Sequence, residues 1–394
     1  MVRELAITMY LFVFRTLFNM FSLFPQKKKT VFVASFGDNI LFTLKELEKQ
    51  VDDQVIILKT SQCKVDFGQA SISKELTFKL SHLFKWIQSI YHLATADKVF
   101  VDNYYGFLAV TDFKPNVQCI QLWHAAGAIK QFGLKDPSIK DRTPRAYERF
   151  LQVYQRFTHV VVGSEKMATI FRESFGLSNE AISRTGIPRS DFFYDTTKMR
   201  EVGRELKASF PVINRKKVIL YAPTYRDDQL NEAKIALDIQ KLEDKFSDQY
   251  VLFLKLHPAI KREFYNAHSN FVYDVSDMAD LNELLVITDI LITDYSSIPF
   301  EFSLLERPMI FFAYDKEEYA NTVGFWEDYE TLVPGSVVGT TEEIIEIIDK
   351  ENFDPTQVRE FAKQWNQYSR GNSSKNLVKA LYTEEKEYQQ VDVN

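Results

Sequence analysis

His124 stands where an apolar run, 117–122, ends at Trp123, and small residues, 125–128, follow it. In open α/β sheets, ligands bind just outside the carboxyl ends of the strands. Histidine is also the side chain whose ordinary pKa allows proton transfer near neutral pH. The small residues leave main-chain N–H groups open to a phosphate or a sugar. The stretch therefore fits a general base, and it fits a packed histidine at a strand end equally well.

Lys255 and His257 close a second apolar run, 250–254, and lie on the same face of the expected strand because they are two residues apart. A cation beside a histidine suits a phosphate whose charge rises while a bond to it breaks. A surface turn before Pro258 is the alternative explanation for His257 alone.

Ser296 and Ser297 follow an apolar run and precede Pro299, which belongs in the first turn of a helix. Their hydroxyls and the free N–H groups of a helix start suit an anion, and a diphosphate is the expected ligand. Glu301, one turn further, is placed to accept hydrogen bonds from a ribose diol. Serine is also a common helix cap with no ligand at all.

Arg189 and Arg226 each follow a turn-like stretch, Gly186–Pro188 and 222–225. A loop arginine at such a point can bind two oxygens of one phosphate, and it can equally form an ordinary surface ion pair. The sequence has no Walker loop, no Gly-X-Gly-X-X-Gly and no Asp-X-Asp pair to hold a metal-bound diphosphate. We therefore expect no metal and no cofactor, with arginine, serine and helix N-termini neutralising the phosphates.

Strand-like and helical stretches alternate along the chain, and the alternation restarts after a turn-like junction at 185–198. A length of 394 residues suits two hydrophobic cores. The pattern predicts an α/β protein with two Rossmann-like domains, each a parallel sheet with helices, facing a central cleft. Strands are expected at 30–36, 55–59, 98–102, 117–122, 159–163, 216–221, 250–258, 289–293 and 308–312, and three helices near 342–350, 355–367 and 374–390.

Near the N-terminus, Leu5–Phe24 is an apolar stretch, interrupted by Arg15 and Asn19 and followed by three lysines at 27–29. A signal peptide has its basic residues before the apolar part, and a charge in the middle is costly for a membrane-spanning helix. An amphipathic helix at the membrane surface, with the lysines on anionic headgroups, explains both features. A helix packed on the protein body is the alternative. The net charge of −6 argues against a nucleic-acid partner.

Five motifs occur in the order seen in one family. Together they resemble the CDP-glycerol glycerophosphotransferases of teichoic acid synthesis over about residues 100–375. Polymerase members usually read Trp-His-Gly-Thr-Pro, whereas His-Ala-Ala-Gly-Ala here resembles the glycerol-phosphate primase branch. At 370–372 the chain departs from the family's usual Asp-Gly. The motifs are Trp123-His124 with Lys130 and Gly133, then 186–191, 221–226, 255–258 and 293–297.

The resemblance implies a GT-B fold with a membrane-surface segment at 1–29, an acceptor domain at 30–190 and a CDP-glycerol domain at 191–394. Pro223 and Thr224 would lie near the cytidine, with the ribose on Glu301. The diphosphate would lie on Ser296 and Ser297. The other residues expected to hold the phosphates or stabilise their charge are Lys130, Arg189, Arg226, Lys255 and His257.

The implied reaction transfers one glycerol phosphate from CDP-glycerol to a hydroxyl of N-acetylmannosaminyl-N-acetylglucosamine on undecaprenyl diphosphate. His124 would act as the base, CMP would leave, and the protein would work peripherally on the cytoplasmic face of the membrane. The alternatives are a poly(glycerol phosphate) or ribitol-phosphate polymerase, a sugar-nucleotide glycosyltransferase and a non-catalytic scaffold. The oligomeric state, monomer or homo-oligomer, stays open.

Overall fold

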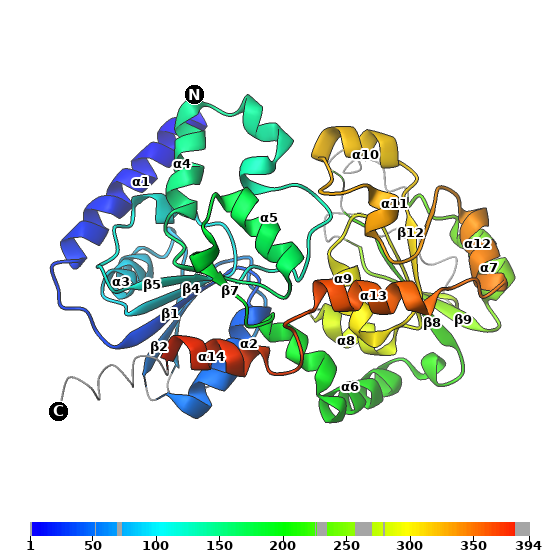
Figure 1. Cartoon of the computed structure of the whole chain (residues 1–394). Coiled ribbons are helices and arrows are strands. Elements are labelled where there is room, and N and C mark those ends of the chain that lie inside the picture. The colour runs from blue at the N-terminus through cyan, green and yellow to red at the C-terminus, as the bar shows by residue number, and fades with distance from the viewer. Residues whose placement is uncertain are drawn as a thin grey trace. The chain divides into compact units, whose positions relative to one another are not determined.

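The computed structural model describes residues 2–51, 53–68, 73–224, 226, 235–256, 270–278 and 280–382, and the chain forms two compact units (Figure 1). Unit 1 comprises Met1–Ala126, Phe132–Asp191 and Gln367–Asn394. Unit 2 comprises Gly127–Gln131 and Phe192–Asn366.

Unit 1 contains a seven-stranded parallel sheet in the order β3-β2-β1-β4-β5-β6-β7. Its first six strands have the order of a doubly wound nucleotide-binding sheet. The central strands are mostly apolar because helices cover both faces of such a sheet, and all six residues of β1 are buried. The strands are β1 (Lys29–Ala34), β2 (Gln54–Lys59), β3 (Ser73–Thr77), β4 (Lys98–Val101), β5 (Gln118–Gln121), β6 (His159–Val161) and β7 (Ile182–Ser183).

Among the helices of unit 1, α5 has a capping residue at each end. In α5, the Ser164 hydroxyl accepts a hydrogen bond from the Met167 N–H, and Gly176 ends the helix in the left-handed region at φ 66°. The main helices of the unit are α1 (Val2–Phe21), α2 (Asp38–Gln50), α3 (Leu83–Ala94), α4 (Pro144–Tyr154), α5 (Glu165–Phe175) and α14 (Ser373–Tyr382).

The last helix, α14, corrects the expected domain boundary. The second domain was expected to run to residue 394, but α14 packs on α2 of unit 1, beside it in Figure 1. The carboxylate of Asp191 accepts hydrogen bonds from the N–H groups of Ser373 (2.7 Å) and Ser374 (2.9 Å), so it holds the start of this helix.

The N-terminal helix, α1, packs on α3 and on the 3-10 helix η1 (Gly106–Val110). Phe14 is fully buried there and stacks on Phe107 at 5.0 Å. The stretch Arg3–Phe21 has a mean hydropathy of 1.3 and meets the length and composition of a membrane-crossing helix, a test that packed helices also pass. Lys29 was expected to contact anionic headgroups, but it is 1% exposed because it begins β1 and donates to Thr95 Oγ1 at 2.6 Å.

Unit 2 contains a six-stranded parallel sheet in the order β10-β9-β8-β11-β12-β13. The predicted α/β class with two Rossmann-like sheets is therefore confirmed. The strands are β8 (Lys217–Ala222), β9 (Tyr250–Leu254), β10 (Val272–Asp274), β11 (Ile290–Thr293), β12 (Met309–Phe312) and β13 (Ser336–Val338).

The helices of unit 2 include the two expected near 342–350 and 355–367. The capping box of Thr340 and Glu343 begins the first of these. The helices are α6 (Thr196–Ser209), α7 (Ile239–Phe246), α8 (Leu281–Ile287), α9 (Ile298–Phe302), α10 (Lys316–Val323), α11 (Tyr329–Leu332), α12 (Thr341–Asp349) and α13 (Pro355–Trp365).

A short segment of the first half, Gly127–Gln131, belongs to unit 2. Lys130 forms an antiparallel bridge with Phe325, and the Gln131 N–H donates to the Gly324 carbonyl at 3.1 Å. A Cβ on Gly127 would lie 2.2 Å from the Phe300 ring, so this close approach requires glycine.

Candidate active site

His124 follows β5 on a strained turn. Trp123 has φ 57°, a left-handed conformation that is rare for a residue other than glycine. The imidazole is half-buried and stacks on the rings of Phe36, at 4.0 Å, and Trp123, at 4.4 Å. Two aromatic faces therefore fix the plane of the imidazole at the carboxyl end of the sheet in unit 1.

The hydrogen bond of Nδ1 fixes the tautomer of His124. Nδ1 lies 3.1 Å from the main-chain carbonyl of Asp102, and because a carbonyl only accepts, Nδ1 carries the proton. Nε2 then has a lone pair. Burial lowers the pKa of His124 to about 4, against the raising effect of the Asp102 carbonyl, and the nearby Arg189 lowers it further. The imidazole is therefore neutral at pH 7 and able to accept a proton at Nε2.

Asp102 organises the turn that covers His124. Its carboxylate accepts hydrogen bonds from the N–H groups of Ser35 (2.9 Å), Phe36 (2.9 Å) and Gly37 (2.7 Å) and from the Tyr105 hydroxyl (2.8 Å). Burial raises the pKa of Asp102, although these four donors lower it. Asp102 therefore positions His124 through its carbonyl and Phe36 through its carboxylate.

Asn39 joins His124 to Arg189. Its amide NH₂ donates to the Trp123 carbonyl at 3.0 Å, and its oxygen accepts from the Arg189 N–H at 3.0 Å. The Arg189 guanidinium lies 3.7 Å from the Asp38 carboxylate. The structure thus brings together His124 and Arg189, which the sequence places 65 positions apart.

Asp102 and Asn39 were not among the predicted site residues. Asp102 was assigned only to the end of a strand, and Asn39 only to a turn before a helix. A polar residue directly after a buried strand is the signal that could have found Asp102, since this edge of a parallel sheet binds ligands. Asn39 offers no comparable signal, because asparagine is common in turns.

Arg226 is the centre of the charged cluster in unit 2. Its guanidinium binds Asp315 with two hydrogen bonds, one of them 3.0 Å long, and lies 2.9 Å from Asp294. Burial alone would lower the pKa of Arg226, but the two carboxylates raise it overall. Arg226 also donates to the Thr224 carbonyl at 2.8 Å, so it shapes the loop after β8. Its expected contact with phosphate stays a prediction.

The loops after β8 and β11 meet at Asp294. Its carboxylate accepts from the Thr224 N–H at 2.7 Å, next to Pro223. The Thr224 hydroxyl is buried, and within the described ranges it has no hydrogen-bond partner. An orphaned hydroxyl at the carboxyl end of a strand is what a polar ligand would satisfy. Pro223 and Thr224 therefore lie at the sheet edge where the donor was expected.

The two serines differ in their contacts. The Ser296 hydroxyl lies 2.9 Å from Thr293 Oγ1, whereas Ser297 occupies the cap position of α9 without a capping side-chain hydrogen bond in the described part of the chain. Both are half-buried at the carboxyl end of β11. Glu301 lies on the five-residue helix α9 and is 2% exposed.

Lys130 lies with this cluster rather than with His124. Burial lowers the pKa of Lys130, Asp294 raises it and Arg226 lowers it, and the ammonium lies 6.0 Å from the Tyr319 ring. Lys255 follows β9 and donates to the Ser276 carbonyl at 3.1 Å. His257 lies outside the described residues.

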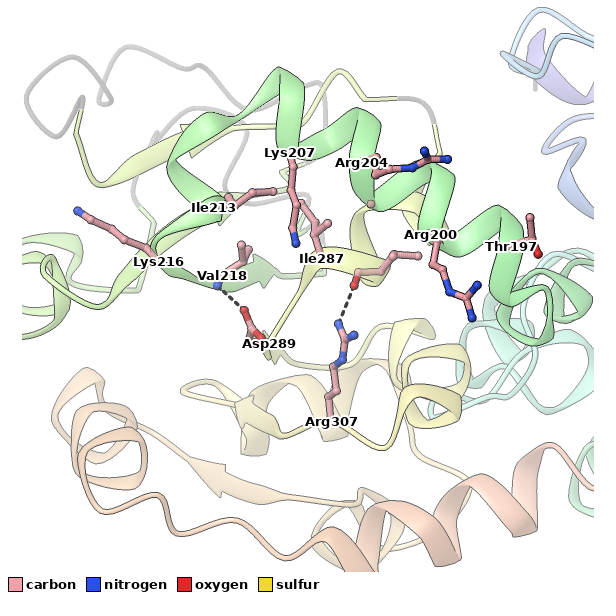
Figure 2. A pocket seen from close by; sticks show the side chains of 12 residues that line it. Thr197, Arg200, Arg204, Lys207, Ile213, Lys216, Val218, Ile287, Asp289 and Arg307 are labelled. Atoms are coloured by element: carbon pink, nitrogen blue, oxygen red, sulfur yellow. Dashed lines mark hydrogen bonds between the residues drawn. The ribbon is translucent and has the colours of Figure 1, made fainter.

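A basic groove of about 750 Å³ lies at the opposite, amino-terminal edge of the unit 2 sheet (Figure 2). Figure 2 shows Arg200 and Lys207 extending from α6 toward the side on which Arg307 lies. Arg307 donates to the carbonyls that end α8, including Thr288 at 2.6 Å. Val218 and Asp289, near the starts of β8 and β11, also line the groove. The groove is therefore separate from the residues expected to bind the donor.

The geometry at the two sheet edges agrees with the comparison to known proteins. The family model described as CDP-glycerol:poly(glycerophosphate) glycerophosphotransferase matches residues 16–383. The chain belongs to this family. It is therefore a CDP-glycerol-dependent glycerophosphotransferase of teichoic acid synthesis, and the predicted resemblance is confirmed.

Three relatives of this glycerophosphotransferase show the range of the family. The teichoic acid glycerol-phosphate primase of Bacillus spizizenii is 35% identical over 351 residues, which cover 88% of this chain and 90% of that protein. The teichoic acid poly(glycerol phosphate) polymerase of the same organism is 30% identical, over 96% and 97%. A variant of the wall teichoic acid polymerase TagF, soaked with CDPG, is 22% identical over 99% of both chains, with a TM-score of 0.79.

Proposed function

We propose that this glycerophosphotransferase is a primase. It transfers one glycerol phosphate from CDP-glycerol to a hydroxyl of undecaprenyl-diphosphate-linked N-acetylmannosaminyl-N-acetylglucosamine. Two features support priming over polymerisation. A glycerol-phosphate primase is 35% identical and is covered over 90% of its length, whereas a poly(ribitol-phosphate) polymerase of the same identity is covered over only 47%. The second feature is the stretch His-Ala-Ala-Gly-Ala at 124–128.

The observation that carries the chemistry is the state of His124. Its proton is on Nδ1 and its Nε2 is unprotonated at neutral pH. Nε2 takes the proton of the acceptor hydroxyl while the oxygen attacks the glycerol-bearing phosphorus. A new P–O bond to the acceptor forms, the P–O bond to CMP breaks, and CMP leaves with the electron pair. The imidazolium then returns its proton to water.

The residues at the carboxyl edge of unit 2 serve the donor in this proposal. The hydroxyls of Ser296 and Thr224 and the ammonium of Lys130 offer hydrogen bonds to CDP-glycerol. Charge-assisted hydrogen bonds to phosphate are the strong ones, and they strengthen as negative charge moves onto CMP. Arg189 supplies a further cation in unit 1 near His124.

The number of units added to each acceptor tests the proposal. The enzyme is incubated with radiolabelled CDP-glycerol in excess and the lipid-linked disaccharide, and the products are separated by length. We expect one glycerol phosphate and one CMP per acceptor. Long chains would show a polymerase instead, and the absence of CMP release would reject both activities.

We also propose that the enzyme works at the cytoplasmic face of the membrane, held by α1. One face of this helix is packed, while Leu5, Met9 and Phe12 on the other are 63%, 63% and 70% exposed. Such a two-faced helix binds in the interface of a bilayer. Because Lys29 is buried, Lys27 and Lys28 remain to contact anionic headgroups.

A further inference from the structure

Unit 1 holds a cavity of about 660 Å³, the α1–α4 cavity, near the carboxyl ends of its strands. Thr60 directly follows β2, Phe78 follows β3, and Tyr104 lies in the loop after β4. This is the sheet edge that carries His124. The volume lies in the range of about 300–1,000 Å³ that small-molecule sites occupy. The residues on which the argument depends are Ile7, Leu11, Tyr104, Tyr105, Arg142 and Arg149, all of which line the cavity.

The cavity is linked to His124 through two hydrogen bonds. The Tyr105 hydroxyl, on a residue that lines the cavity, donates to Asp102 at 2.8 Å. The Asp102 carbonyl in turn accepts the Nδ1–H of His124 at 3.1 Å. A ligand in the cavity therefore lies against the same short loop that positions the base.

Aromatic rings form much of the lining. Tyr104 lies 5.0 Å from Phe150, and Phe78 lies 5.4 Å from Phe107 in an edge-on contact. Tyrosine offers an apolar ring face together with a hydroxyl that makes hydrogen bonds. This combination suits a sugar ring, which has apolar C–H faces and a rim of hydroxyls.

Charged side chains of both signs also line the cavity: Arg3, Arg142 and Arg149 with Glu4 and Asp141. Arg149 binds Glu4 with hydrogen bonds of 2.9 and 3.2 Å, which join α4 to α1. The guanidinium of Arg142 lies 4.8 Å from the centre of the Phe150 ring, and among the described residues no carboxylate forms an ion pair with it. An arginine without a carboxylate is the residue that best binds phosphate oxygens in pairs.

The helix α1 connects the cavity to an apolar surface. Ile7 and Leu11 line the cavity, while Met9 and Phe12 of the same helix are more than half exposed. A ligand with a sugar and a diphosphate at one end and a hydrocarbon at the other matches this arrangement. The aromatic lining suits the sugar, the arginine suits the diphosphate, and the apolar surface suits the hydrocarbon.

We propose that the α1–α4 cavity binds the acceptor, with its sugar on Tyr104 and Tyr105 and its lipid-linked diphosphate on Arg142. The proposal rests on the proposed function, because it takes a prenyl-diphosphate-linked disaccharide as the acceptor. It adds the residues that recognise this acceptor.

Steady-state kinetics of Tyr104→Ala and Arg142→Gln test the proposal, with the lipid-linked disaccharide and CDP-glycerol varied in turn. We expect each variant to raise the KM for the acceptor by about tenfold or more, the effect of losing a ring contact or a charge-assisted hydrogen bond. The KM for CDP-glycerol should stay within about twofold of the wild-type value, and Tyr104→Phe should restore most of the acceptor affinity.

Tyr147→Ala and Arg145→Gln are matched controls, since both residues are exposed on α4 and neither lines the cavity. Equal effects in variants and controls, or equal rises in both KM values, would overturn the proposal. Calorimetry of CDP-glycerol binding distinguishes a failure of the cavity assignment from a failure of the proposed function. If the wild-type enzyme binds CDP-glycerol but never releases CMP with this acceptor, the proposed function fails and the assignment of the cavity fails with it.

Discussion

At the scale of single residues, the two nitrogens of His124 have different tasks. Nδ1 is committed to the Asp102 carbonyl, and the rings of Phe36 and Trp123 hold the plane of the imidazole. Burial and the positive charge of Arg189 keep Nε2 unprotonated. A histidine held in this way does not need a carboxylate partner to be a base, although a low pKa also makes it a weaker one.

The pH dependence of kcat/KM should report this low pKa. Because protonation removes the base, the rate falls as the pH drops through the pKa of His124, which is lowered to about 4. We expect kcat/KM to stay nearly flat from pH 8 to about pH 5.5, where an ordinary histidine with a pKa of about 6.5 would already be mostly protonated.

Arg189→Gln should move this acid limb to higher pH, because it removes a positive charge that lowers the pKa of His124. Arg184→Gln is the control, since Arg184 is exposed to solvent and pairs with Glu165 instead. An acid limb near pH 6.5 in the wild-type enzyme, or an unmoved limb in Arg189→Gln, would contradict this account of the base.

At the scale of elements, the segment Gly127–Gln131 comes from the first half of the chain but packs in unit 2. It bridges Phe325 through Lys130, and its first residue lies against Phe300. The motif that begins at His124 therefore supplies the proposed base to unit 1 and a cation, Lys130, to unit 2. The spacing of His124 and Lys130 follows from this, since the chain changes units after Ala126.

Gly127→Ala should destabilise the protein, because the new methyl group would lie 2.2 Å from the Phe300 ring. Overpacking of this kind costs about 1–3 kcal/mol. Differential scanning calorimetry should show a lower Tm for the transition of unit 2. Gly106→Ala is the control, since its Cβ would meet nothing within 4 Å. Equal Tm values for the two variants would show that the segment does not pack as described.

The elements also show where prediction from sequence succeeds. Strands with continuous apolar runs, such as β1 and β9, were predicted because burial on both faces leaves a clear pattern. The edge strands β3, β7, β10 and β13 were missed, since they are short and partly exposed and therefore carry polar residues. Their pairing depends on neighbours that are distant in the sequence.

Some residues of the candidate site were predicted from the sequence, and others were missed. His124, Thr224 and Ser296 were predicted because each follows an apolar run, and the structure places each near a carboxyl strand end, while their roles stay predictions. Asn39 acts on the Trp123 carbonyl, 84 positions away, and no local pattern identifies it. Asp102 binds the His124 side chain, 22 positions away, and only its place after a buried strand marks it in the sequence. The placement of α14 on unit 1 depends likewise on Asp191, which lies 182 positions before Ser373.

At the scale of the whole molecule, a lipid-linked acceptor requires the enzyme to reach a membrane. The proposed anchor is the exposed face of α1, which carries Leu5, Met9 and Phe12, while Phe14 and Phe18 are fully buried against unit 1. Deleting the helix would uncover that buried surface, so the exposed face alone is the appropriate target for mutation.

The double variant Met9→Gln and Phe12→Gln should weaken binding to vesicles of anionic phospholipid. Each exposed apolar side chain that enters the bilayer contributes on the order of 1–3 kcal/mol, so a loss of tenfold or more in the bound fraction is expected in a sedimentation assay. Tyr194→Gln, which removes a 45% exposed side chain from unit 2, should leave binding unchanged. Unchanged binding of the double variant would place the membrane contact elsewhere.

The central claim of the account is that Nε2 of His124 takes the proton of the acceptor. His124→Asn tests it most directly, because an asparagine amide retains a donor for the Asp102 carbonyl but has no nitrogen at the position of Nε2. The measurement is the rate of CMP release with saturating acceptor, together with CDP-glycerol binding by calorimetry. We predict that turnover falls by about a hundredfold or more while the Kd for CDP-glycerol changes by less than about threefold. Turnover within about threefold of the wild-type rate, with the protein folded and the donor bound, would contradict the assignment of His124 as the base.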